Sequence, residues 1–154
     1  MAIFPLFRRR KKFFPDDDTR LIVKAIRQAE KSTSGEVRVF VESRCSWMDA
    51  INRAAELFFR LKMDHTEQRN GVLVYVAMKD RQLAVFGDQG IHQKVGTEYW
   101  NKLVAEMLSS FNKEDYAQGI AESVIQIGNA LHTHFPYDRD TDKNELPDDI
   151  VFGR

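Results

Sequence analysis

The stretch at residues 72–78, Val-Leu-Val-Tyr-Val-Ala-Met, constrains the fold of this chain more than any other part of its sequence. It is apolar from end to end, so a strand formed here must be covered on both sides. Asn70-Gly71 precedes it and Lys79-Asp80 follows it, and both pairs are typical of turns. Residues 81–86 are then expected to return as an antiparallel strand. The sequence therefore predicts a buried β-hairpin that ends in a turn at residues 87–90.

Residues 37–41 predict another strand, because valines occupy its alternate positions. Between this strand and the hairpin lies an amphipathic helix, for which Ser46 is the expected N-cap and Asp49 the third helical residue. A strand–helix–strand order implies parallel strands joined by a right-handed crossover. Together with the antiparallel hairpin, this order predicts a small mixed sheet of three to four strands. The buried stripe of the helix is expected to hold Trp47, Ile51, Ala54, Ala55 and Phe58.

Further amphipathic helices are expected on both sides of the hairpin in the sequence. The acids at residues 16–18 favour a helix start through the macrodipole, and Thr97 and Asn112 are the expected caps of two later helices. Apolar residues recur at helical spacing in each of these segments, so each helix has one face to bury. The helices suffice to cover both faces of a small sheet. The predicted fold class is therefore α/β, a three-layer α/β/α sandwich.

Three parts of the chain differ in composition. Residues 1–15 carry an unbroken basic run from Arg8 to Lys12 together with several phenylalanines, and residues 16–135 hold all the periodic segments. Residues 136–154 show no periodicity and are acidic, since six acids and three bases follow Tyr137. We therefore expect a basic N-terminal segment, one α/β domain and a mobile acidic tail.

Bulk composition excludes several classes of protein. The formal net charge is zero and the aromatic residues fall on buried stripes, so no nucleic-acid partner is expected. The sequence has a single cysteine, Cys45, no secretory leader, and no apolar stretch of the roughly 20 residues that stable membrane insertion requires. We expect a cytoplasmic monomer. Attachment of the segment from Phe4 to Lys12 to an anionic membrane surface is a weaker alternative.

The predicted topology brings polar residues to one edge of the sheet. The two parallel strands start at this edge and the antiparallel strand ends there, so Glu36, Asn70 and Asp88 are expected close together. The connection that holds Asp64 arrives at the same place. Carboxylate and amide oxygens are the ligands that hard cations prefer, so these four residues are the candidate ligands of calcium or magnesium. Asn70 and Asp88 are also explained as turn formers that bond their own backbone.

Three segments resemble the TPM domain family, which is named after a thylakoid lumen protein, a photosystem II repair protein and a receptor modulator. They are residues 34–39, 69–76 and 84–91, and the resemblance covers most of the chain, from about residue 13 to residue 135. It implies an α/β/α sandwich with a divalent-cation site near the matched turns. Some plant members are credited with acid phosphatase activity, and other members are accessory proteins of membrane complexes.

The chain resembles a cytoplasmic branch of this family, because it shows neither the signal peptide nor the membrane anchor that many members carry. It also has Gly87-Asp88-Gln89-Gly90 where the family usually has a Gly-aromatic-Gly turn. This departure adds an acid and changes the glycine spacing at the expected cation site.

Two functions remain open from the sequence. The first is a non-enzymatic accessory or protein-interaction module with an unknown protein partner, steadied by a divalent cation; it is favoured because no complete catalytic constellation appears. The alternative is a metal-assisted acid phosphatase acting on phosphomonoesters. In that case Asp88 would orient water or phosphate, and His65 or His92 would donate a proton. Arg38 or Arg69 would hold the phosphate.

Overall fold

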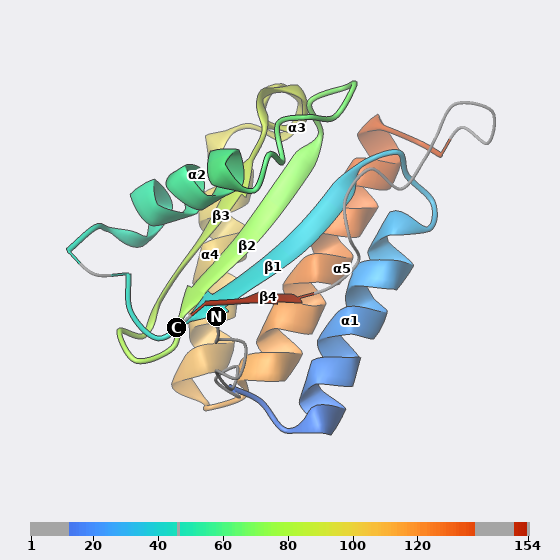
Figure 1. The fold of residues 1–154 in the computed structure, drawn as a ribbon. Helices are drawn as coiled ribbons and strands as arrows, with labels where there is room; N and C mark the ends of the chain where they lie inside the picture. Colours follow the sequence, from blue (N-terminus) through green and yellow to red (C-terminus); the bar gives the residue numbers. More distant parts are fainter. Residues whose placement is uncertain (1–12, 46, 138–149, 154) are drawn as a thin grey trace, which may run out of the picture.

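A computed structural model describes residues 13–45, 47–137 and 150–153, and it shows a four-stranded sheet between helices (Figure 1). The strands are β1 (Glu36–Glu42), β2 (Gly71–Ala77), β3 (Gln82–Gly87) and β4 (Ile150–Phe152). The helices are α1 (Asp16–Glu30), α2 (Ala50–Arg60), α3 (Gln89–Val95), α4 (Thr97–Asn112) and α5 (Tyr116–His134). Helices α1, α4 and α5 cover one face of the sheet and α2 covers the other, so the predicted three-layer sandwich is confirmed.

The sheet has the order β3-β2-β1-β4. β1 runs parallel to β2 with Glu36 opposite Gly71, and β2 runs antiparallel to β3 with Val72 opposite Gly87. The predicted parallel pair, the hairpin and the mixed sheet are therefore confirmed. β4 pairs in parallel with the other side of β1, so β3 and β4 are the edge strands.

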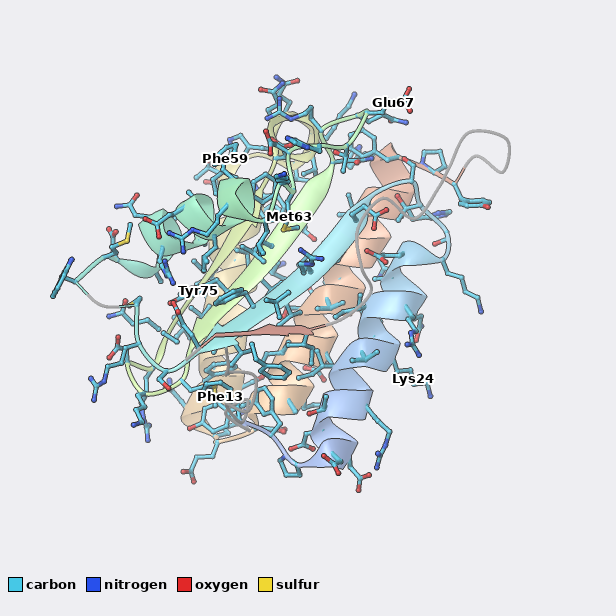
Figure 2. The ribbon with its side chains drawn as sticks, in the orientation of Figure 1. Phe13, Lys24, Phe59, Met63, Glu67 and Tyr75 are labelled. Carbon is cyan, nitrogen blue, oxygen red and sulfur yellow. The ribbon has the colours of Figure 1, made fainter. Side chains whose placement is uncertain are left out.

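Two apolar cores lie on the two faces of the sheet. On one face the alternate valines of β1 and β2 pack against the buried faces of α1, α4 and α5. On the other face Leu73 and Tyr75 of β2 pack with Phe58 and Met63 under α2 (Figure 2). Every residue of β2 is buried, as its unbroken apolar sequence predicts.

Three predicted helix starts are wrong. α4 begins at Thr97 itself, with Gly96 in the N-cap position, so this prediction is off by one residue. α2 begins at Ala50 with Asp49 in the N-cap position, and Ser46 lies outside the described residues. Trp47 consequently precedes the helix and is 98% exposed, so it does not belong to a buried stripe. α5 begins at Tyr116 after Asp115, because residues 113–115 form the turn that separates it from α4.

The structure also contains elements that the sequence did not predict. α3 begins directly after Asp88, so the chain continues from the expected turn into a short helix. β4 lies within the segment expected to be a tail; Pro136 pairs with Thr33, and residues 138–149 are outside the described part. Of the expected basic segment the structure describes only its end, where Phe13 stacks on Phe152 with ring centroids 6.0 Å apart. None of the described helices is both long and apolar enough to cross a membrane.

Candidate functional site

The polar edge predicted from the topology is present where β1 and β2 start and β3 ends. The backbone N–H of Asp88 donates to the carbonyl of Gly71 at 2.9 Å, and the N–H of Glu36 donates to the carbonyl of Asn70 at 3.4 Å. These bonds continue the sheet register past the strand ends. Glu36, Asn70 and Asp88 therefore start from neighbouring backbone positions, as expected.

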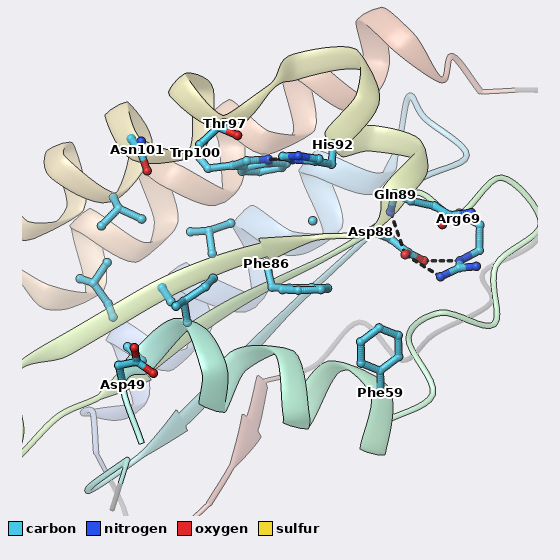
Figure 3. A pocket seen from close by; sticks show the side chains of 17 residues that line it. Asp49, Phe59, Arg69, Phe86, Asp88, Gln89, His92, Thr97, Trp100 and Asn101 are labelled. Atoms are coloured by element: carbon cyan, nitrogen blue, oxygen red, sulfur yellow. Dashed lines mark hydrogen bonds and ion pairs between the residues drawn. The ribbon is translucent and has the colours of Figure 1, made fainter. Parts of the chain in front are cut away.

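At this edge Asp88 forms an ion pair with Arg69. Arg69 donates from Nε to Asp88 Oδ2 at 2.6 Å and from Nη2 to Oδ1 at 2.9 Å, and the Asp88 side chain is only 3% exposed (Figure 3). The hydrogen bonds that Arg69 donates to Asp88 raise the pKa of its guanidinium above the ordinary value. Asp88 Oδ1 also accepts from the backbone N–H of Gln89 at 2.8 Å. The pair thus anchors the loop before β2 to the start of α3.

Asn70 is buried, and its side chain is only partly satisfied. Its Nδ2 donates to Ser34 Oγ at 3.2 Å, whereas its Oδ1 has no hydrogen-bond partner among the described residues. Asp64 is partly exposed, and one of its oxygens lies 3.9 Å from His65 Nε2. The described residues contain no group of three or more His, Cys, Asp or Glu side chains placed to hold a metal ion. The calcium or magnesium site at Glu36, Asp64, Asn70 and Asp88 stays a prediction.

A second buried polar cluster lies on the α2 side of the sheet, and the sequence analysis did not predict it. Arg53 donates from Nε and Nη2 to the two carboxylate oxygens of Glu42, at 2.8 and 3.0 Å. Tyr75 donates its hydroxyl to the same carboxylate. Burial, followed by the Glu42 contact, raises the pKa of Tyr75. The cluster joins α2 to β1 and β2, and its three side chains bond to one another.

Cys45 is buried near the turn between β2 and β3. Its backbone N–H donates to Asp80 Oδ2 at 2.9 Å, and its thiol lies 3.4 Å from the same oxygen. Burial and the carboxylate raise the pKa of the thiol. Reactive cysteines need the opposite shift, toward thiolate.

A large groove lies beside edge strand β3, between α2 and α4 (Figure 3). We call it the β3 groove; its volume is about 820 Å³. Ile51 and Phe59 of α2 line one side, and Trp100 and Val104 of α4 line the other. The Arg69–Asp88 pair lies at the end of the groove beside α3.

Packing around Gly87 and Phe86 shapes the groove. A Cβ at Gly87 would overlap the six-membered ring of Trp100, so only glycine lets the indole lie over the end of β3. Trp100 Nε1 donates to His92 Nδ1 at 3.0 Å, which fixes the indole against α3. On the other side the ring of Phe86 packs 4.8 Å from Phe58 and 5.9 Å from Phe59, between centroids. These aromatic contacts give the groove apolar walls on both sides of the strand.

The sequence analysis missed this groove. Its walls come from three segments that lie far apart in the chain. Two signals were available in the sequence: Ile51 was assigned to a buried stripe that the short helix could not fully bury, and Phe59 follows Phe58 on α2. Ile51 is 48% exposed and Phe59 is 50% exposed.

Fold and site together define a small α/β/α sandwich with an apolar groove at one open sheet edge. The model of the TPM domain family matches residues 8–130. The chain therefore belongs to the TPM domain family, and the predicted family resemblance is confirmed.

Solved structures agree with this assignment. The BA42 protein of the psychrophilic bacterium Bizionia argentinensis is 38% identical, with a TM-score of 0.84 over 93% of this chain and 97% of that one. The N-terminal domain of a P. gingivalis protein is 14% identical, with a TM-score of 0.66 over 82% of this chain and 83% of that one. The N-terminal domain of a Corynebacterium glutamicum protein is 10% identical, with a TM-score of 0.57 over 90% and 80%. The last two show the fold alone. No curated protein matched the chain.

Proposed function

We propose that this TPM domain is a protein-interaction module and that the β3 groove binds an extended segment of a partner protein. The observation that carries the proposal is the convergence of exposed apolar side chains on the outer edge of β3, which has no strand partner in the described part of the chain. Phe59 and Ile51 are half exposed at the groove, and Trp100 and Phe86 line it. Contiguous apolar surface of this kind marks interaction sites on soluble domains.

The shape and charge of the groove favour a peptide over a compact ligand. Cavities of this volume also suit small molecules, but this one follows the length of a strand and lies open along its side. The Arg69–Asp88 charges at one end neutralise each other. Asp49 at the α2 start is exposed; it accepts a hydrogen bond from Asn52 Nδ2 and has no ion pair among the described residues. A partner segment that is apolar and carries a base near Asp49 matches this pattern.

A selection experiment with the full chain tests this proposal. Peptides are selected from a displayed random library, and their affinities are measured by calorimetry for the wild type and for two variants. Phe59→Glu places a charge in the groove, and we expect it to weaken binding at least about tenfold. Leu21→Glu on α1 is the matched control, because Leu21 is 37% exposed away from the groove. Selected peptides that bind both variants equally well would overturn the proposal.

A divalent cation at the polar edge is a second candidate, favoured by the unpartnered Oδ1 of buried Asn70. A carbonyl oxygen with no hydrogen bond in a buried site is a ligand that calcium or magnesium accepts. Titration of the full chain with calcium or magnesium chloride tests this, and flat heats at millimolar ion would overturn it. Metal-assisted phosphatase activity would build on the same ion; phosphomonoester turnover that needs the ion and is lost in Asp88→Asn would support it.

A further inference from the structure

We infer that the partner segment binds as an added β-strand, hydrogen-bonded to the free edge of β3. This inference rests on the proposed function and specifies how the groove recognises its ligand. β3 has only β2 as a strand neighbour among the described residues, so one side of its backbone has no strand partner. Such an edge is a template on which another chain can form main-chain hydrogen bonds.

The register identifies the backbone groups that point into the groove. In an antiparallel ladder, hydrogen-bonded pairs alternate with pairs that direct their N–H and C=O groups outward. The bond from Asp88 N–H to Gly71 O makes that pair a hydrogen-bonded one. Counting back along the β2–β3 register, Leu83, Val85 and Gly87 direct their backbone groups away from β2. All three also line the groove.

The flanking helices restrict the occupant to a single strand. α2 and α4 both contribute walls to the groove, so the β3 edge is recessed between them (Figure 3). A second copy of this chain has its own β3 edge recessed in the same way, and its helices would meet these helices before the two strands could pair. A lone extended segment can enter the recess.

The walls also specify the sequence of the segment. One face of the added strand would lie against Trp100 and Val104, and the other against Phe59 and Ile51, so successive side chains are apolar on both faces. β3 has six residues, which corresponds to about 20 Å of extended chain. A run of four to six apolar residues, with Lys or Arg at the Asp49 end, therefore fits the groove.

The other edge of the same sheet gives an internal precedent. Ile150–Phe152 is a short apolar strand that pairs along β1, with Ile150 only 3% exposed. Sheet extension by a short apolar strand is thus already part of this fold. The β3 edge offers outward-directed backbone groups between apolar walls.

Backbone-methylated peptides test strand addition directly. Two fluorescent hexapeptides, Lys-Val-Ile-Val-Phe-Val and its reverse order, are titrated into the full chain, since the base must reach Asp49 in either strand direction. In the tighter binder, each backbone amide is N-methylated in turn. Methylation at one set of alternate residues should weaken binding at least tenfold, and methylation at the other set should change it little. Asp49→Asn should weaken binding of the lysine peptide several-fold and leave an alanine counterpart unchanged.

The outcomes separate this inference from the function on which it rests. Equal effects of methylation at all positions, or no binding of either hexapeptide at millimolar concentration, overturn strand addition. The groove itself still stands if peptides selected from the library lose affinity in Phe59→Glu and keep it in Leu21→Glu. Both proposals fail if methylation does not change the affinity of the hexapeptide and Phe59→Glu does not change the affinity of any selected peptide.

Discussion

The strands β1 and β3 differ in whether a further strand of the chain pairs with their outer side. At the β1 edge, the segment Ile150–Phe152 returns to add β4, and Gly153 continues the contact through a bond from its N–H to the carbonyl of Val41 at 2.6 Å. At the β3 edge no described strand is added, and two helices form apolar walls beside it. The chain itself therefore extends the sheet beside β1, whereas the outer side of β3 has no strand partner among the described residues.

This contrast supports the proposal that the open edge is a binding site. Unprotected edge strands invite aggregation, and proteins commonly protect them with charges, prolines, bulges or covering segments. β3 carries no charged residue and no proline, and its recess between α2 and α4 is what limits access. A recess of this kind excludes another sheet while admitting a single strand, as the proposed function requires.

The largest effect is expected at the polar corner that ends the open edge. Asp88→Ala removes both bonds to Arg69 and the cap of α3, and it leaves the guanidinium without its partner. Because Arg69 is 35% exposed and can partly reach water, we expect the free energy of unfolding to fall by about 2–4 kcal/mol, toward the low end for a broken buried pair. Urea denaturation followed by circular dichroism measures it. Asp17→Ala, which breaks an exposed pair, should cost under about 1 kcal/mol.

The closed edge should depend on side-chain burial. Ile150→Ala removes most of a buried side chain from β4, and we expect a loss of about 2–3 kcal/mol, the lower part of the range for such truncations. Val151→Ala is the control at the next residue, since Val151 is only partly buried; it should cost clearly less. A loss below about 0.5 kcal/mol for Ile150→Ala would mean that β4 contributes little to closing this edge.

Amide hydrogen exchange compares the edges without any substitution. Leu83 and Val85 direct their N–H groups into the groove, whereas Ala84 and Phe86 bond to β2. We expect the first two amides to exchange at least about tenfold faster than the second two. Addition of a binding hexapeptide should slow the exchange of Leu83 and Val85 selectively. Uniform exchange along β3 would show that its outward amides are already engaged.

Much of the central fold could be predicted from local patterns. The unbroken apolar run of β2 and the alternating valines of β1 carry their own burial signal, and the crossover rule then determines how the strands pair. β4 could not be predicted in this way, because three residues are too few to show a period and the pairing partner is distant in the chain. Local capping patterns also placed the start of α2 too early, at Ser46.

The candidate site shows the same division. Topology predicted that Asp88 and Asn70 would be neighbours, because strand register decides this. Topology could not predict that Arg69 pairs with Asp88. That contact depends on the loop backbone at Arg69, where φ is 52°, and on the side-chain geometry there. The β3 groove depends on where α2 and α4 lie relative to β3, which no local pattern encodes.

The smallest effect is expected at the turn that begins the open edge. Asp80 accepts from the backbone N–H of Cys45 and pairs with Arg44, and the Cys45 bond is the main cause that holds its pKa below the ordinary value of 3.8. A carboxylate with a lowered pKa in the folded state stabilises the fold above pH 3.8, and this contribution is lost as pH falls through the lower folded-state pKa. Thermal melts of the wild type should therefore lose stability below about pH 4, and Asp80→Asn should show a shallower loss over that range. Identical pH profiles for the two proteins would show that Asp80 does not help to hold β3 at its start.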